Sequence, residues 1–349
     1  FETILAQTRA WCFVSGNKLP SLSQRISIAY PPMARDGDII FGVTMFRSLS
    51  VILICLMTVP VTAAGGELTR LGYGRLINND LLGDLRDRER TGSFSSSRVW
   101  GREWDGNLPR AAGALIELRL GLEVLAPDRL NNPRPGSRPW AGALSVGVHT
   151  HFERNNIEFA MGASIYATGP QTQLGELQQQ FHQLIGAPAP SDRTLAGQIG
   201  NGYHPTILIE AGRRFDFGTT TSLRPFIEAQ AGVEDLVRAG FDLTLGGVGH
   251  QELLVRDTTT GHRYRVIQND AATGFSWVAG ADIAHVSSST YLPRDRGYVL
   301  TNQRKRLRMG VHWQSERLSA FYGLTWLGKE YSTQPNDQVV GSVRINYAF

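Results

Sequence analysis

The chain has 349 residues, of which 42% are hydrophobic and 19% are charged, with 38 Gly and two Cys. This composition is typical of a folded chain with a substantial core, and it excludes a collagen-like repeat, a disordered polyelectrolyte and a small disulfide-stabilised protein. A bundle of transmembrane helices is excluded as well, because each helix needs about 20 consecutive apolar residues. A single segment, 48–61, approaches that length.

Segment 48–61 has the features of a secretory signal peptide. Arg47 precedes it, an apolar run follows at 51–57, and Val61-Thr62-Ala63 supplies the small residues that signal peptidase requires. Because the sequence opens with Phe1, we predict that Met45 is the true start. Residues 1–44 would then be an upstream extension outside the mature protein, 45–63 the signal peptide and 64–349 the mature chain.

Removal of residues 1–63 changes the charge and the cysteine count. It takes away five of the 35 basic and three of the 31 acidic residues, so the net charge falls from +4 to +2. Nucleic acid is not an expected partner at that balance. Cys12 and Cys55 also precede the predicted mature start, so an exported chain would be stabilised by packing or by closure of a sheet rather than by disulfides.

Several segments of the mature chain alternate between apolar and polar residues. In 114–125, Leu118, Leu120 and Leu122 share one face while Arg119 and Glu123 share the other, and 275–283 alternates in the same way. Such strands fit either a half-buried soluble sheet or a barrel in lipid with a polar lumen.

The last residues distinguish between these two architectures. In 339–349, Val343, Ile345, Tyr347 and the C-terminal Phe349 lie on one face of the predicted strand. A C-terminal Phe that closes an amphipathic strand, with Tyr two positions before it, resembles the closing strand of bacterial outer-membrane barrels. The alternative is a soluble periplasmic sandwich that ends in Phe by chance.

We therefore predict an all-β fold, a closed antiparallel transmembrane β-barrel. The even number of strands, twelve, is typical of single-chain bacterial barrels. The predicted strands are 70–80, 91–104, 112–126, 138–153, 156–168, 203–216, 221–233, 236–249, 272–286, 304–315, 317–329 and 338–349.

Segment 171–187 interrupts the strand pattern. Leu174, Leu177, Phe181 and Leu184 follow helical spacing, and Pro170 suits a first helical turn. We predict a short amphipathic helix after the fifth strand. With the N-terminus in the periplasm, connections after odd-numbered strands lie outside the cell, so this helix is predicted to be extracellular.

Polar residues of several kinds are predicted to meet at that outer rim. His182 lies on the helix with Gln178 one turn earlier, Asn79 and Asp80 end the first strand, and Thr91 opens the second. A neutral imidazole is a suitable base for water, while carboxylate and amide oxygens bind hard cations, so the set suits ester hydrolysis. The alternative is that His182 is a solvated or packing residue of a surface helix.

The block 169–187 resembles the most distinctive block of the lipid A 3′-O-deacylase (LpxR) family of Gram-negative outer membranes. Other similar blocks follow the family's order over essentially the whole mature chain: Asn79-Asp80, Asp87 to Thr91, Arg138 to Gly142, Gln198, and Lys329 to Ser342. The resemblance implies a twelve-stranded barrel that removes the 3′-linked acyloxyacyl chain from lipid A in a Ca²⁺-dependent reaction.

The resemblance also implies roles for individual residues. The family's catalytic His matches His182, its helix Gln matches Gln178, its Asn-Asp pair matches Asn79 and Asp80, and its Thr matches Thr91. His182 would deprotonate water, and Ca²⁺ held by Asp80 and Asn79 would stabilise the oxyanion. The expected partners are lipid A of lipopolysaccharide and the outer membrane, with the protein as a monomer.

The chain departs from the family pattern around Thr91. The family has Tyr-Thr-x-Gly shortly after Asp-Arg, whereas this chain has Arg90 in place of Tyr and Ser93 in place of Gly, which leaves the register of Thr91 open by one residue. These losses favour an alternative, a non-catalytic structural or lipid-binding barrel of the same family. A passive pore is a third hypothesis, although polar side chains would fill much of a twelve-stranded lumen.

Four arginines are candidates for binding the phosphates of lipid A through forked hydrogen bonds: Arg129, Arg134, Arg138 and Arg193. The alternative is that they solvate loops. His149 and His151 share a strand face, and strand parity predicts that they line the lumen near the periplasmic end rather than bind a metal.

Overall fold

The computed structural model describes residues 68–268 and 273–347. The predicted upstream extension, the signal peptide with its boundaries at 44/45 and 63/64, and Phe349 lie outside the described residues.

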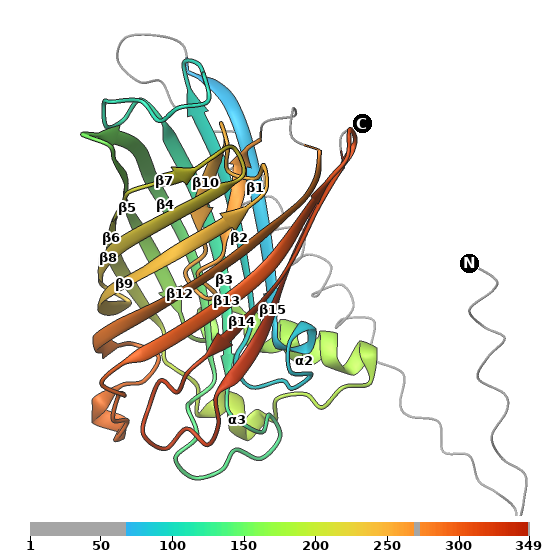
Figure 1. The fold of residues 1–349 in the computed structure, drawn as a ribbon. Helices are drawn as coiled ribbons and strands as arrows, with labels where there is room; N and C mark the ends of the chain where they lie inside the picture. The colour runs from blue at the N-terminus through green and yellow to red at the C-terminus, as the bar shows by residue number, and fades with distance from the viewer. Residues whose placement is uncertain (1–67, 269–272, 348–349) are drawn as a thin grey trace, which may run out of the picture. The chain divides into compact units, whose positions relative to one another are not determined.

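The described chain forms a closed antiparallel barrel of twelve strands (Figure 1), which confirms the predicted fold. Each barrel strand pairs with the next along the chain, and the pairs β1–β15 and β6–β8 close the sheet. The barrel strands are β1 (Thr69–Asn79), β2 (Glu89–Gly101), β3 (Ile116–Ala126), β4 (Ala141–Arg154), β5 (Ile157–Thr168), β6 (Gly202–Gly212), β8 (Thr221–Ala231), β9 (Glu234–Leu245), β12 (Gly274–Ser289), β13 (Arg304–Gln314), β14 (Leu318–Leu327) and β15 (Gln338–Tyr347). The predicted strand 203–216 is divided, since β7 (Phe215–Phe217) pairs with β8 alone.

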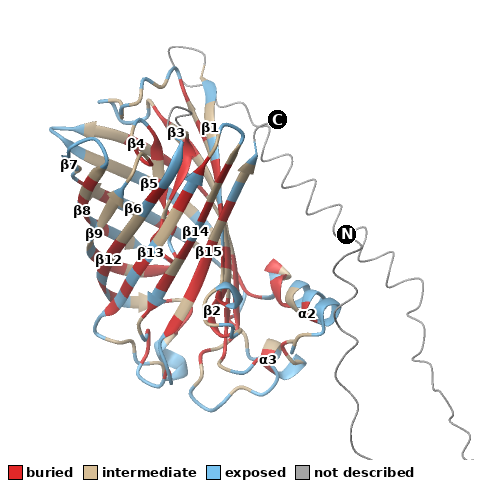
Figure 2. Cartoon of the chain, turned by 45° about the vertical axis from the view of Figure 1, so that its right-hand side comes forward, coloured by how far each residue is buried: buried red, intermediate tan, exposed pale blue. Residues whose placement is uncertain are grey.

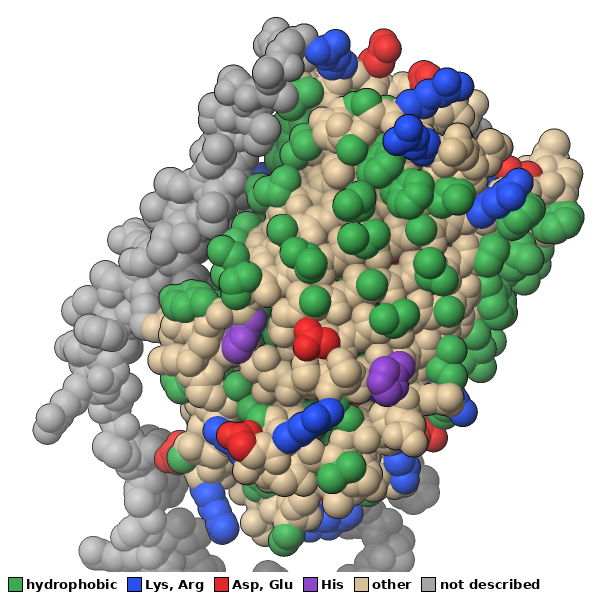
Figure 3. Space-filling model, turned by 90° about the vertical axis from the view of Figure 1, so that its left-hand side faces the viewer, with side chains coloured by type: hydrophobic (Ala, Val, Ile, Leu, Met, Phe, Trp, Pro, Cys, Tyr) green, Lys and Arg blue, Asp and Glu red, His purple; other side chains and the backbone are tan. Residues whose placement is uncertain are grey.

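The strands alternate in burial as they alternate in sequence (Figure 2). On β12, Phe275 and Trp277 are exposed while Ser276 and Asp282 are buried. Hydrophobic side chains cover the outer face of the wall (Figure 3), as expected of a barrel that faces lipid. None of the helices in the described part of the chain has both the length and the hydropathy to span a membrane.

A hairpin that the sequence analysis did not predict lies inside the barrel. Its strands, β10 (Leu253–Arg256) and β11 (Arg263–Ile267), belong to the connection between β9 and β12. Val255 and Tyr264 are buried in one apolar cluster with Leu76 of β1, whose side chain points inward. The hairpin therefore occupies the lumen, which argues against a passive pore.

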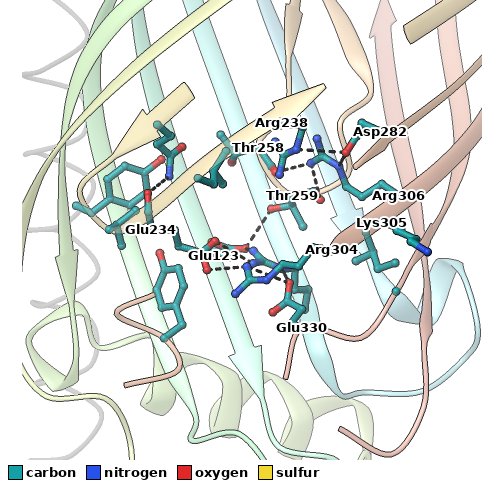
Figure 4. A pocket seen from close by; sticks show the side chains of 18 residues that line it. Glu123, Glu234, Arg238, Thr258, Thr259, Asp282, Arg304, Lys305, Arg306 and Glu330 are labelled. Atoms are coloured by element: carbon teal, nitrogen blue, oxygen red, sulfur yellow. Dashed lines mark hydrogen bonds and ion pairs between the residues drawn. The ribbon is translucent and has the colours of Figure 1, made fainter. Parts of the chain in front are cut away.

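Arginine–carboxylate pairs line another part of the lumen (Figure 4). Arg304 lies 2.7 Å from Glu234, and Asp282 lies 2.9 Å from Arg306 and 3.2 Å from Arg238. These side chains come from β9, β12 and β13, so the pairs link strands across the inner face of the sheet. The same inner face includes His149 and His151, which are buried, and His151 Nε2 lies 2.6 Å from Glu117.

Glycine on β1 allows the hairpin to approach the wall. A Cβ at Gly74 would lie 2.3 Å from the carbonyl oxygen of Arg265. We expect Gly74→Ala to displace β11 and to lower the free energy of unfolding by about 1–3 kcal/mol, the usual cost of overpacking. Urea unfolding monitored by tryptophan fluorescence measures this change. Gly200→Ala is the control, since a Cβ there meets nothing within 4 Å. Equal unfolding midpoints for the two variants would contradict the prediction.

The short helices gather at one end of the barrel, opposite the end at which β15 finishes (Figure 1). This helical end carries η1 (Asp80–Leu82) between β1 and β2, and η2 (Pro170–Thr172), α2 (Leu174–Ile185) and α3 (Asp192–Ala196) between β5 and β6, with η3 (Arg294–Arg296) between β12 and β13. The predicted helix 171–187 is thus confirmed as η2 followed by α2.

Candidate active site

His182 is buried on α2 and held by its own connection. Its Nδ1 lies 2.7 Å from the carbonyl oxygen of Pro188. A carbonyl can only accept, so Nδ1 carries a proton and donates it. The other ring nitrogen, Nε2, lies 3.1 Å from a carboxylate oxygen of Asp87. The imidazole is therefore fixed on one side and turned towards the connection between β1 and β2.

Asp87 joins the imidazole to two further residues of that connection. Its second carboxylate oxygen accepts a hydrogen bond from the hydroxyl of Thr91. The same hydroxyl lies 3.2 Å from Oδ1 of Asp80. Because a hydroxyl has one proton, it can donate to only one of these carboxylates at a time. The structure thus brings His182, Thr91 and Asp80 together through Asp87.

A β-bulge places Thr91 at this position. The pairing of β2 with β3 passes from Arg90–Leu125 to Gly92–Val124, so Thr91 is the extra residue. A bulge re-aims side chains and is common next to active sites. Here the Arg90 side chain enters the lumen while Thr91 contacts the carboxylates.

Asp80 is the most deeply buried member of the cluster. The backbone N–H of Arg88 donates to its Oδ2 at 2.7 Å, and the side-chain amide of Gln338 lies 3.4 Å from the same oxygen. Burial raises the pKa of Asp80 to about 8; the hydrogen bond from Arg88 opposes this rise, and the negative charge of Asp87 adds to it. A positive charge nearby would stabilise the ionised carboxylate.

The two predicted amide residues have structural partners. The side-chain oxygen of Asn79 accepts a hydrogen bond from the backbone N–H of Leu81 at 2.8 Å and so caps η1. The side-chain oxygen of Gln178 accepts from the indole N–H of Trp140, also at 2.8 Å. Asn79 therefore shapes the turn that carries Asp80, and Gln178 anchors α2 to the barrel.

The donor chemistry of the cluster suits a hard cation. In the part of the chain that the structure describes, no group of three or more His, Cys, Asp or Glu side chains is arranged to hold a metal ion by itself. However, Asp80 and Asp87 share a single hydroxyl, and Oδ1 of the neighbouring Asp84 is buried without a hydrogen-bond partner. Carboxylate oxygens are the ligands that Ca²⁺ prefers, with water and main-chain carbonyls as its other ligands.

Comparison with known proteins identifies the family. The family profile described as Outer membrane protein LpxR matches residues 50–349. The chain belongs to the LpxR family. It is accordingly an outer-membrane protein. The solved structure of LpxR from Salmonella typhimurium has 16% sequence identity and a TM-score of 0.65, and the match covers 80% of this chain and 100% of that one.

Two further solved structures match this LpxR-family chain with lower TM-scores. The β-domain of the Bordetella autotransporter BrkA has 11% identity and a TM-score of 0.39, with 80% of this chain and 99% of that one covered. The KdgM porin in complex with disordered oligogalacturonate has 5% identity and a TM-score of 0.36, with 80% and 98% covered. A search among curated proteins gives no match.

The prediction that Arg138 binds phosphate at the surface is wrong. Arg138 is fully buried, and its Nη1 lies 3.1 Å from Glu330 and 3.5 Å from Glu89. Two carboxylates already neutralise the guanidinium of Arg138, and a phosphate at the surface cannot reach it. Arg129 and Arg193 are exposed, and Arg134 is half-exposed and paired with Asp128 at 3.0 Å.

Asp87 is the functional candidate that the sequence analysis missed in this LpxR-family chain. It belonged to the Asp87–Thr91 block, but no role was assigned to it. Its position four residues before Thr91 in a charged turn was the available signal. The contact with His182 depends on how the β1–β2 connection folds against α2, which spacing alone does not reveal.

Trp140 holds α2 in place, and its removal is expected to loosen the helix. Trp140 is buried, and loss of its indole N–H would leave the Gln178 oxygen without this donor, at a cost of about 1 kcal/mol. We expect Trp140→Phe to raise hydrogen-exchange rates of the α2 amides severalfold, measured by mass spectrometry of peptides that cover 174–185. Trp326→Phe on the outer wall is the control and should leave these rates unchanged. Equal exchange in both variants would show that the bond does not restrain α2.

Proposed function

We propose that this protein is an outer-membrane esterase that removes the 3′-linked acyloxyacyl chain of lipid A. Membership of the LpxR family and the location in the outer membrane support this substrate. The observation that carries the proposal is the contact of His182 Nε2 with Asp87, next to Thr91 and Asp80. Ester hydrolysis by activated water requires at least a positioned general base, and an imidazole beside carboxylates can serve as one.

His182 acts as the general base in this proposal. Its Nδ1 stays protonated because it donates to Pro188 O, so Nε2 is the nitrogen that takes a proton from water. The resulting hydroxide attacks the ester carbonyl. Asp87, 3.1 Å from Nε2, stabilises the imidazolium that forms. The proton then passes from His182 to the departing sugar alkoxide as the carbon–oxygen bond breaks. The acyloxyacyl chain leaves as a carboxylic acid, which loses its own proton to solvent.

Asp80 and Asp87 are the side chains that would hold Ca²⁺, with the oxygen of Asn79 available if the η1 cap opens. When bound, the ion supplies electrostatic stabilisation of the oxyanion. The hydroxyl of Thr91 donates to one of the two carboxylates at a time, and Gln178 fixes the helix that presents His182.

The exposed arginines suit the anionic headgroup. Arg129, Arg134 and Arg193 lie in the connections after β3 and β5 at the helical end, which the proposal places outside the cell. These two connections contact each other, since the backbone N–H of Ser191 donates to Leu130 O at 3.2 Å. Guanidinium groups bind phosphate through forked hydrogen bonds. One chain supplies every group named here, so we propose a monomer as the active form.

Mass spectrometry of lipid A tests the proposal. Cells that express the full chain are expected to lose the 3′ acyloxyacyl group from their lipid A, whereas cells with an empty vector keep it. Unchanged lipid A, from a protein shown to be folded in the outer membrane, would overturn the esterase and favour a non-catalytic barrel of the same family.

Removal of the metal is expected to stop the reaction. With purified protein in detergent and lipid A as substrate, a Ca²⁺-selective chelator should reduce deacylation to background, because the carboxylates would lose their counter-charge. Millimolar Ca²⁺ should restore it, and Mg²⁺ at the same concentration is the control for nonspecific ionic effects. Full activity in the presence of chelator would refute Ca²⁺ dependence without refuting the His182 base.

A further inference from the structure

Two segments at the helical end, the β1–β2 connection and the helix α2, expose seven large apolar side chains. We call these side chains the interfacial patch. Leu184 is 83% exposed and Leu85 is 77% exposed. The members of the interfacial patch are Leu81, Leu82, Leu85, Leu177, Phe181, Leu184 and Ile185.

The β1–β2 part of the patch lies on the outer side of the barrel wall. The hydroxyl of Tyr322, an exposed residue of β14, donates to Leu82 O at 2.8 Å. A Cβ at Gly341 of β15 would lie 2.5 Å from Cβ of Leu82. Val340 and Ser342, on either side of Gly341, are buried on the inner face, so strand parity turns Gly341 outward, where Leu82 covers it. The turn after β1 thus covers the outer face of β15 rather than the lumen.

The patch continues the lipid-facing surface of the wall. Ile77 precedes it on β1 and is 52% exposed, and Ile345 on the neighbouring β15 points outward as well. Figure 2 shows α2 at the side of the barrel, with exposed residues along the helix. The helix is amphipathic, because Phe181 and Leu184 lie on one side and Gln179 and Gln183 on the other.

Leu85 adds a second observation. Its φ of 60° lies in the left-handed region that favours glycine. An apolar side chain that is exposed in an unfavourable backbone conformation contributes little to packing within the chain. Large exposed apolar surface of this kind marks an interaction site.

We infer that the interfacial patch is embedded among the acyl chains of outer-leaflet lipids. In this arrangement α2 lies at the membrane surface as an interfacial amphipathic helix, with its apolar side in the acyl region and the exposed Gln183 towards water. The continuity with the barrel wall selects lipid as the occupant over a second copy of this chain. His182, next to Phe181 on α2, is then held at the depth of the lipid ester groups. The inference concerns the fold and does not depend on the esterase proposal.

Spin-label accessibility tests the inference. In the full chain with Cys12→Ser and Cys55→Ser, a nitroxide is attached at Leu184→Cys or, in a second variant, at Leu85→Cys. The protein is placed in vesicles of phosphatidylcholine and phosphatidylglycerol. Collisions of the label with oxygen, which concentrates in the acyl region, are compared with collisions with a water-soluble nickel chelate.

Two control positions calibrate the result. A label at Leu307→Cys on the outer wall reports acyl chains, and a label at Gln183→Cys reports the polar side of α2. For labels at 184 and 85, we expect collisions with oxygen to exceed collisions with the nickel chelate severalfold, as for the label at 307. If both behave like the label at 183, the inference is wrong. It is also wrong if they show dipolar broadening that grows with the protein-to-lipid ratio, since the patch would then bind a second copy.

Discussion

His182→Ala is expected to lower the rate of lipid A deacylation by about 10²–10⁴-fold, the usual contribution of a general base. The ring is buried, and both of its nitrogens have defined partners, Pro188 O and Asp87. Alanine cannot take the proton from water, and no other imidazole contacts the cluster among the described residues. The barrel should remain folded, because α2 belongs to a connection and not to the wall.

Initial rates of fatty acid release from lipid A in detergent measure this effect. Gln183→Ala is the matched control, since Gln183 is the next residue of α2 and is exposed. Asp87→Asn then tests whether the two groups act as a unit: if they do, the double variant should be no slower than His182→Ala alone. If the fold reductions in rate of the two single variants multiply in the double variant, Asp87 acts independently of the imidazole. If His182→Ala remains active, His182 is not the general base.

Strand patterns in the sequence were sufficient to predict the barrel wall. The alternation in 114–125 and 275–283 reports a wall that is apolar outside and polar inside, and all twelve predicted strands have a counterpart. The hairpin β10–β11 was missed because its strands have four and five residues and are buried almost throughout. A strand that is covered on both faces shows no alternation, so its residues cannot be distinguished from those of a turn.

The sequence predicted which residues gather in the candidate site, but it did not predict their contacts. His182, Thr91 and Asp80 were named from chemistry and resemblance, while Asp87 was not, because its contact with the imidazole arises from a turn and a bulge. Arg138 was misassigned for a related reason. Its partners, Glu89 and Glu330, are distant in sequence and converge only when the barrel closes. The order of residues in the sequence does not show which charged side chains pair across a closed sheet.

Arg90, which replaces the tyrosine expected from the family pattern, connects the site to the lumen. Its guanidinium bonds to Glu330 and Glu123 at 2.5 Å each and to Glu234 at 3.1 Å. Figure 4 shows these three glutamates converging from different segments of the chain. The backbone N–H of Arg90 donates to Oε1 of Gln338 at 3.1 Å. The residue before Thr91 in the bulge is therefore fixed from two sides.

Arg90→Met is expected to lower the free energy of unfolding by about 3–5 kcal/mol, because Glu123 loses its ion-pair partner while Glu234 and Glu330 each lose one of theirs. Arg90→Tyr, which restores the residue of the family pattern, should destabilise the barrel as well, since the three glutamates remain. Urea unfolding in lipid vesicles measures both, with the exposed Arg86→Met as control. If Arg90→Tyr unfolds at the same urea concentration as the unaltered protein, the three-carboxylate contact is not what stabilises this part of the lumen. If Arg90→Met is destabilised but keeps full deacylase activity, the ion pairs of Arg90 in the lumen are not needed to position Thr91.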